Sequence, residues 1–271
     1  MLSLALSVLC SVVIANLLMV FNRKGGKSIL PVFLGNYLMA AGFSFFALPV
    51  GTGFPKAFDL LFGILSGAFF LFNFLVYQRN ILINGMSLSV SVMRVAMIVP
   101  IVASLIIFQE RIGAWNVCGI VLAIGAFLLR TEKGSLHNLF WLLGLFAVSG
   151  ATDLSLKIFK EFGSGSEPLY VFIIFSSAFI FTLILIFLRR ELIPWQGFVF
   201  GLVLGLPNRF STVFFLRGLD SVPAAIAYPI TAIGVVLVSL LSDIVFWKRR
   251  LNFREALMYS ALTCSILLLN I

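Results

Sequence analysis

Charged residues and histidine are scarce in this chain of 271 residues. Only 11% of the residues are charged and one is a histidine, whereas 61% are hydrophobic and the mean hydropathy is +1.14. A soluble domain carries about 25% charged residues, so this composition excludes water as the main solvent. In a bilayer, only helices and closed barrels satisfy their own backbone hydrogen bonds. We therefore expect an integral membrane protein.

Residues for metal, redox or hydrolytic chemistry are equally few. Cys10, Cys118 and Cys264 fall inside apolar runs without CxxC spacing, which indicates small buried hydrophobes and not disulfides or metal ligands. The single histidine, His137, lies in a loop, and the chain has no HExxH motif, no paired-Asp motif and no P-loop. These absences argue against an enzyme and against ATP-driven transport. We expect no metal and no cofactor.

Ten apolar runs of membrane-spanning length follow one another along the chain. A bilayer core of ~30 Å takes about 20 residues as a helix, and the runs lack the period-two alternation of barrel strands. Because no Lys or Arg precedes Arg23, we expect the first run to be a membrane helix and not a signal peptide. The predicted all-α spans cover residues 1–21, 30–50, 57–78, 85–108, 113–129, 139–159, 168–188, 196–217, 222–246 and 254–270.

The two halves of the chain resemble each other at an offset of about 138 residues. At this offset the GxxxG pair Gly63 and Gly67 falls on Gly201 and Gly205, both in the third span of a half. We therefore predict two five-helix repeats, residues 1–130 and 139–271. Since five is odd, the second repeat enters the membrane from the opposite side. Inverted repeats are typical of secondary transporters, whose substrate lies between the halves.

Basic residues are distributed unevenly between the two sides of this topology. The odd-numbered loops hold twelve of them and the even-numbered loops five, and because cytoplasmic loops are rich in Lys and Arg, we expect the odd loops inside and both termini outside. The net charge of +9 then reflects topology and attraction to anionic lipid, not nucleic-acid binding. The odd-loop residues are Arg23, Lys24, Lys27, Arg79, Arg130, Lys133, Arg189, Arg190, Lys248, Arg249, Arg250 and Arg254, and the even-loop residues are Lys56, Arg111, Lys157, Lys160 and Arg217.

One segment resembles a known family. Residues 100–111 place a proline within the fourth span and the pair Glu110-Arg111 at its end, and Trp115, Gly119 and Gly125 follow in the fifth span. This pattern resembles the end of an EamA domain. With ten spans in two five-span repeats, the whole chain resembles the drug/metabolite transporter superfamily.

The resemblance is weaker in the second repeat, where Val238 stands at the position of the proline and Lys248 at that of the glutamate. What the resemblance implies is a ten-helix transporter of small organic solutes. It also implies a central cavity lined chiefly by spans 1, 3, 4, 6, 8 and 9.

Two arginines fall near the middle of predicted spans, where an ionisable group costs roughly 2.5–3.5 kcal/mol on insertion scales. Arg94 follows Ser91 by three residues on the same helical face. Arg209 follows Asn208 and precedes Thr212 by three residues. Because such groups face a cavity or a partner, both arginines are candidate substrate-binding residues. The alternative is a structural arginine, ion-paired or bonded to backbone carbonyls.

The sixth predicted span carries a polar stripe of Ser149, Asp153 and Lys157, spaced four residues apart on one face. One interpretation is a pair between Asp153 and Lys157 that neutralises both. The other is that Asp153 pairs with Arg94 or Arg209 across the cavity, which leaves Lys157 to attract substrate. Proton coupling at Asp153 is left open.

Further candidate binding residues are Asn73 and Tyr77 in the third span and Tyr228 and Thr231 in the ninth. Because cations outnumber Asp153 at membrane depth, we predict a secondary transporter of a small anionic or zwitterionic solute, such as an amino acid or other metabolite. The alternatives are a flippase of a phosphate-bearing lipid carrier, marked by a lipid opening between helices, and a scaffold without a cavity. We expect the solute and membrane lipid as partners, no nucleic acid, and the bacterial inner (plasma) membrane as location; a homodimer is left open.

Overall fold

A computed structural model gives the structure of residues 1–23, 29–84, 86–129, 138–247 and 252–271. These described ranges form eleven α-helices and no strand, which confirms the predicted all-helical fold class. The helices are α1 (Leu2–Arg23), α2 (Leu30–Phe46), α3 (Ala57–Asn84), α4 (Met86–Val95), α5 (Ile98–Ile106), α6 (Ala114–Leu129), α7 (Leu139–Phe162), α8 (Glu167–Arg189), α9 (Trp195–Gly218), α10 (Ala224–Trp247) and α11 (Phe253–Leu269).

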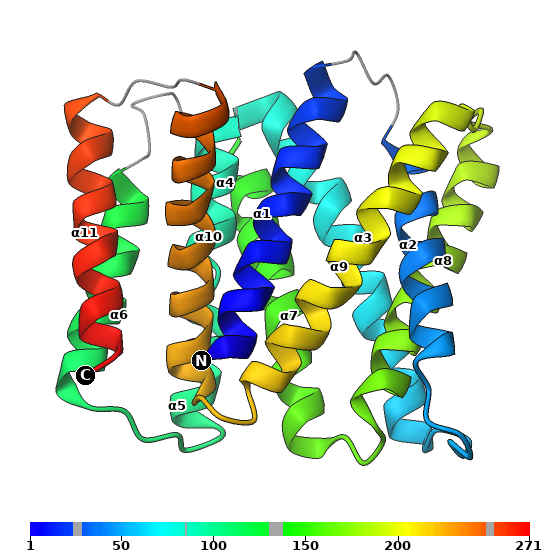
Figure 1. Cartoon of the computed structure of the whole chain (residues 1–271), viewed down its shortest axis with the longest axis horizontal. Coiled ribbons are helices and arrows are strands. Elements are labelled where there is room, and N and C mark those ends of the chain that lie inside the picture. Colours follow the sequence, from blue (N-terminus) through cyan, green and yellow to red (C-terminus); the bar gives the residue numbers. More distant parts are fainter. Residues whose placement is uncertain (24–28, 85, 130–137, 248–251) are drawn as a thin grey trace.

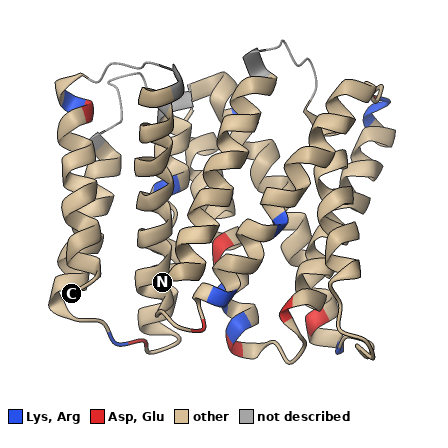
Figure 2. Ribbon diagram, viewed as in Figure 1, with Lys and Arg blue, Asp and Glu red and all other residues tan. Residues whose placement is uncertain are grey.

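The helices pack side by side, with their axes running between the two ends of the molecule (Figure 1). Both chain termini lie at one end, together with the α2–α3, α5–α6, α7–α8 and α9–α10 connections. We call this end the terminal face and the opposite end the far face. Figure 2 shows that charged residues are sparse at the middle height of the helices and gather toward the ends.

Seven helical stretches of the described chain are long and apolar enough to cross a membrane, so the chain is a multi-pass membrane protein. Two further apolar helices, α2 and α6, have only 17 and 16 residues, which at 1.5 Å per residue is about 25 Å. Some of the ten predicted spans are therefore longer than the helices that the structure shows. In the run predicted over 30–50, for example, the helix ends at Phe46 before a turn that contains Pro49 and Gly51, the latter with φ +83°. The seven stretches are Leu2–Phe21, Ala57–Asn84, Leu88–Ile106, Leu139–Phe162, Glu167–Arg189, Trp195–Gly218 and Ala224–Ser242.

Helices α4 and α5 are the two halves of one span that breaks at Ala96 and Met97. Proline has no N–H, and its ring clashes with the carbonyl four residues earlier, which for Pro100 is the carbonyl of Ala96. The Met97 N–H instead bonds to Arg94 O at 3.2 Å, and the Val99 N–H bonds to Ala96 O at 3.0 Å. Pro100 thus accounts for the break, and it leaves Arg94 in the last turn of α4.

The two glycine pairs predicted from the repeat lie at two helix crossings. The pair on α3 faces α8, where a Cβ on Gly67 would lie 2.5 Å from Ile174 O. The pair on α9 faces α2, where a Cβ on Gly201 would lie 2.1 Å from Val32 O. Glycine is required for backbones that approach so closely. In both crossings, the third span of one half packs against the second span of the other.

One main apolar core joins the two halves. It contains buried residues from α1 and α2 in the first half and from α8 and α10 in the second, including Leu4, Tyr37, Phe175 and Ile233. The halves therefore form a single packed body, and the polar side chains described next lie within or beside this core.

Candidate functional site

Arg209 on α9 is buried at the crossing with α2, with 7% of its surface exposed. Its Nε donates to Ser44 Oγ at 3.1 Å, and its guanidinium carbon lies 5.0 Å from the centroid of the Phe210 ring. Within the described chain, no Asp or Glu forms an ion pair with Arg209, and neither Nη group has a hydrogen-bond acceptor. A guanidinium has five N–H donors. Most of those of Arg209 are therefore available to an acceptor from elsewhere.

The seam between α2 and α9 holds more donors than acceptors. Asn208 Nδ2 donates to Asn36 Oδ1 at 3.1 Å, while Asn36 Nδ2 is buried without a partner in the described chain. The Ser44 hydroxyl donates to Ala40 O at 2.7 Å and so is free to accept from Arg209. The position of Arg209 differs from the expectation in one respect. The resemblance implies a cavity lined by spans 1, 3, 4, 6, 8 and 9, whereas Arg209 forms a hydrogen bond with a residue of α2, the second span.

Arg94 and Asp153 are brought together in the structure. The Arg94 guanidinium acts electrostatically on the Asp153 carboxylate, and Asp153 lies in the middle of α7. The hydroxyl of the buried Tyr228 on α10 donates to the backbone carbonyl of Asp153 at 2.5 Å. Predicted site residues on α4 and α10 therefore both interact with Asp153 on α7.

The milder polar candidates are engaged mainly in helix contacts. Ser149 Oγ on α7 donates to Asn73 Oδ1 on α3 at 2.7 Å. Thr231 donates to a carbonyl one turn back on its own helix at 2.8 Å. Ser91 is 2% exposed, and Tyr77 is partly buried on α3. Asn73 is joined through Ser149 to the polar stripe on α7.

Lys157 pairs with two carboxylates, neither of which is Asp153. Its Nζ lies 2.6 Å from Glu110 Oε1 and also contacts Glu161 Oε1, one turn further along α7. The predicted Asp153–Lys157 pair is therefore wrong: the partner on the same helix is Glu161, which is also four residues away. With two carboxylates around one ammonium, Lys157 has no excess positive charge for a substrate anion, so the expectation that it attracts substrate loses its basis.

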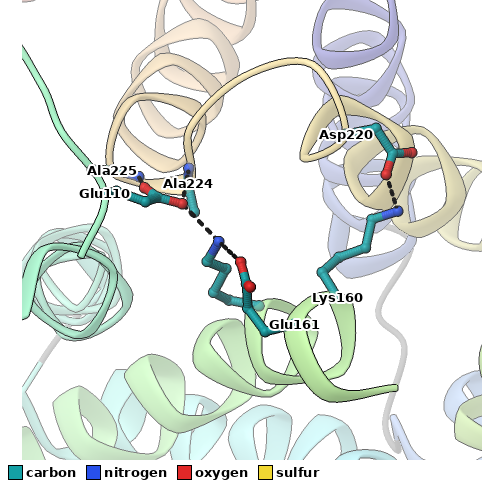
Figure 3. Close-up of polar contacts among 7 residues, drawn as sticks. Glu110, Lys160, Glu161, Asp220, Ala224 and Ala225 are labelled. Atoms are coloured by element: carbon teal, nitrogen blue, oxygen red, sulfur yellow. Dashed lines mark hydrogen bonds and ion pairs between the residues drawn. The ribbon is translucent and has the colours of Figure 1, made fainter. Parts of the chain in front are cut away.

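Glu110 lies just beyond α5, next to a residue with left-handed backbone conformation, and its side chain reaches the start of α10. Gln109 has φ +53°, a conformation that costs a non-glycine residue about 1 kcal/mol or more, and the Glu110 N–H bonds back to Ser104 O at 2.9 Å. The carboxylate then accepts from the N–H groups of Ala224 at 3.0 Å and Ala225 at 2.9 Å, the first two residues of α10. Figure 3 shows Glu110 at the start of α10, with Glu161 nearby.

The charge of Glu110 is stabilised by this arrangement. Burial by itself raises the pKa of the carboxyl group, but the hydrogen bonds from Ala225, Lys157 and Ala224 and the charge of Lys157 outweigh it, so the pKa is lowered below its ordinary value. The positive end of a helix dipole also favours an anion at this position. Glu110 is therefore ionised at neutral pH.

A second group of charges lies at the terminal face. Lys160 on α7 contacts Glu167 at the start of α8. Its Nζ also lies 2.5 Å from Oδ1 of Asp220, just after α9 (Figure 3). In the α7–α8 connection, Ser164 donates to the buried carboxylate of Asp59 through its N–H at 3.2 Å and its Oγ at 3.1 Å. Ion pairs and hydrogen bonds thus tie the ends of several helices together at this face.

Hollows are present toward both faces of the described part of the molecule. A groove of about 690 Å³ lies between α1 and α10 toward the far face, with apolar walls that include Val13, Leu17 and Leu241. Toward the terminal face the same two helices close, because Val8 packs against Gly234. A second hollow of about 380 Å³ lies at the terminal face, between the α2–α3 and α7–α8 connections.

Glu110, Glu161 and Ser44 were not among the residues predicted for the site. Glu161 could have been found, because it stands four residues after Lys157 on the same helix. Glu110 was noted only as part of a family pattern, and no sequence signal connects it with Lys157 or with Ala224, 114 residues away. The same is true of Ser44, which lies 165 residues from Arg209.

Comparisons with known proteins agree with the fold and leave the chemistry open. No protein-family model matches the chain. An uncharacterized protein of Haemophilus influenzae is 28% identical over 270 residues, which cover 92% of this chain and 91% of the relative. A solved structure described only as the crystal structure of a protein is similar with a TM-score of 0.79, over 99% of this chain and 98% of that one, at 11% identity. At that identity the likeness shows a shared fold over the whole chain and nothing about activity.

Proposed function

We propose that this chain is a secondary transporter of a small anionic or zwitterionic organic solute, such as an amino acid or other metabolite, and that it works by alternating access as drug/metabolite transporters do. Arg209 carries the proposal. It is a cation buried within a membrane-spanning helix, and the described chain supplies it with one hydroxyl and no carboxylate. A charge at that depth needs a partner. A solute carboxylate or phosphate would supply one, in a geometry that the planar guanidinium binds through two parallel hydrogen bonds.

Other polar groups have roles consistent with such a solute. The unpartnered Asn36 Nδ2 on the same seam is a second donor for an anionic group. The ammonium of a zwitterion would meet the Asp153 carboxylate, which now interacts with Arg94. In this proposal Lys157 has no contact with the substrate, because Glu110 and Glu161 already neutralise it.

The alternating-access part of the proposal rests on an inverted duplication of residues 1–130 and 139–271. The reciprocal crossings support it: α3 packs on α8 through Gly67, and α9 packs on α2 through Gly201. If α4 and α5 count as one broken span, the described chain has five helical rods in each half. Repeats of opposite orientation can rock around a site at their interface and expose it to each side in turn.

The bacterial inner membrane is the location we propose, with the far face in the cytoplasm. By sequence, the odd-numbered loops hold twelve basic residues and the even-numbered loops hold five. Those of the twelve that the structure describes lie in or next to the ends of α1, α3, α8 and α11 at the far face, namely Arg23, Arg79, Arg189, Arg190 and Arg254. The positive-inside rule then places both termini outside.

A thermal-shift screen of the purified protein against charged metabolites tests the substrate class. A ligand at 100 times its Kd stabilises the native state by about 2.7 kcal/mol. We expect anionic or zwitterionic compounds to raise the unfolding temperature of the wild-type protein and of Arg217→Ala, which removes an exposed arginine from the same helix. The effect should disappear in Arg209→Ala. An equal ligand shift in Arg209→Ala would exclude Arg209 as the anion contact.

The groove between α1 and α10 favours one second candidate, a flippase of a phosphate-bearing lipid carrier. Its apolar walls lie at membrane depth and could receive a hydrocarbon chain while Arg209 receives the phosphate. The same screen separates the two candidates. If the protein is a flippase, the lipid carrier should stabilise it and the soluble headgroup alone should not. If it is a solute transporter, a soluble anionic or zwitterionic compound should stabilise it and the lipid carrier should not.

A further inference from the structure

Glu110 connects elements from both halves of the chain at the terminal face. It follows α5 in the first half, and its carboxylate binds Lys157 of α7 and the N–H groups of Ala224 and Ala225, all in the second half. When two halves rock apart at one face, contacts that join them at that face must break. The contacts of Glu110 with α7 and α10 join the halves at the terminal face, so they must break when this face opens.

Helix α10 has no local cap of its own. Helix N-termini leave their first N–H groups unsatisfied, and a Ser, Thr, Asp or Asn just before the helix usually accepts from one of them. Pro223 precedes α10 and offers no side-chain acceptor. Instead, the acceptor comes from a residue 114 positions earlier in the chain. The start of α10 is therefore satisfied only while the terminal face is assembled.

The sequence does not place a carboxylate at the matching position of the second repeat. At the repeat offset of 138 residues, the counterpart of Glu110 is Lys248. An ammonium group has donors only, so it cannot accept from the N–H groups at a helix start. The residue that matches Glu110 in the second repeat therefore cannot form the same contact.

We propose that the Glu110 carboxylate is a lock that holds the terminal face closed, so that the resting protein is open or ready to open at the far face. This inference rests on the alternating-access function proposed above. The lock releases when α10 and α7 move away from the end of α5 together, which exposes the start of α10 and the last turns of α7 to water.

Hydrogen–deuterium exchange of the ligand-free protein in lipid nanodiscs tests this directly. The variant is Glu110→Gln, which has nearly the same shape but loses the charge and one acceptor oxygen. The matched control is Glu161→Gln, which also removes a carboxylate from Lys157 but has no contact with α10. Glu110→Asp, with the same charge and a shorter reach, is the second variant and should act in the same direction if Glu110→Gln does not fold.

In Glu110→Gln we expect peptides from the start of α10 and the end of α7 to exchange about tenfold faster, since hydrogen bonds to a charged group are worth about that factor in population. Far-face peptides, such as the end of α3 and the start of α11, should exchange more slowly, because opening one face closes the other. Glu161→Gln should leave both sets near the wild-type rates. Faster exchange confined to the first residues of α10, or equal changes in Glu161→Gln, would overturn the lock.

This measurement does not depend on the identity of the substrate. Faster exchange at the terminal face and slower exchange at the far face, without any ligand whose binding depends on Arg209, would retain the lock and reject the proposed substrate class. Arg209-dependent ligand binding without opposite changes in exchange at the two faces would retain the proposed substrate class and reject the lock.

Discussion

Glu110 and Lys157 stand 47 residues apart in the chain, and their side chains form an ion pair with an N–O distance of 2.6 Å. Both side chains are largely buried, with 14% and 7% of their surface exposed respectively. The pair joins the end of α5 to α7, and through the same carboxylate it reaches the start of α10. A single acidic residue thus connects three helices at the terminal face.

Removal of Lys157 should be strongly destabilising. Lys157→Ala leaves two carboxylates next to each other with no cation between them, and breaking a buried pair in this way costs about 3–5 kcal/mol. Arg189→Ala is the control, because exposed Arg189 and partly exposed Glu191 form a pair at 3.9 Å that is worth about 1 kcal/mol or less. The measurement is the unfolding temperature in detergent. Equal shifts in the two variants would show that the buried network does not hold the terminal face together.

Stability should fall on acidification through Glu110. Its pKa in the folded protein lies below the ordinary value of 4.5, so the folded state binds fewer protons than the unfolded state and the carboxylate stabilises the fold above that value. The contribution is lost as the pH falls through the folded pKa. The charged groups facing Glu110 are Lys157 and, behind it, Glu161 on α7, while α10 contributes N–H groups.

The corresponding experiment compares unfolding temperatures at neutral pH and at about pH 4, which brackets the ordinary pKa of a glutamate. Wild type should lose more stability than Glu110→Gln over this interval. The same acid dependence in both proteins would assign the loss to other carboxylates.

The close helix crossings give a prediction that is independent of function. Gly201→Ala would place a Cβ 2.1 Å from Val32 O, so α2 and α9 must separate, and overpacking of this kind costs about 1–3 kcal/mol or more. Gly42→Ala on α2 is the matched control, because a Cβ there meets nothing within 4 Å. That substitution should be neutral or stabilising by up to about 1 kcal/mol, the difference in helix propensity. If Gly201→Ala lowers the unfolding temperature no more than Gly42→Ala does, α2 and α9 do not pack as closely as the structure shows.

The orientation of the molecule is tested with reporters fused to the C-terminus. Both termini lie at the terminal face (Figure 1), and from the distribution of basic residues we predict that this face lies outside. A reporter that is active only in the cytoplasm should stay silent, and one that is active only outside should give a signal. The reverse result would invert the proposed topology and move the Glu110 lock to the cytoplasmic side.

The sequence was most informative where a local pattern determines the structure. Apolar runs predicted the helices, and Pro100 lies where the fourth span breaks, because a missing N–H and a ring clash act within one turn. The glycine pairs were recognised from the repeat, although their partners Ile174 and Val32 were not. Contacts across the fold were harder to predict: the interaction of Arg94 with Asp153 was one of two alternatives, and the contact of Glu110 with Lys157 was missed.

Lys157 illustrates the limit. Its spacing from Asp153 allowed a pair, but Glu161 has the same spacing on the other side, and Glu110 approaches from a distant part of the chain. Only tertiary packing decides between them. Arg209 is similar: its depth in the membrane could be read from its position in an apolar run, whereas its contact with Ser44 could not.

We propose above that Arg209 binds an anionic group of the transported solute, and transport in proteoliposomes measures the effect of this contact on flux. The substrate is the compound that stabilises the purified protein most, and its flux is compared in wild type, Arg209→Ala, Arg209→Lys and Arg217→Ala. We expect Arg209→Ala to lose at least about tenfold in flux, since leaving a buried charge unpaired costs about 2 kcal/mol or more. Arg209→Lys should recover only part of it, because lysine lacks the planar fork, and Arg217→Ala should resemble wild type. Wild-type flux in a folded Arg209→Ala protein would show that Arg209 does not bind the solute.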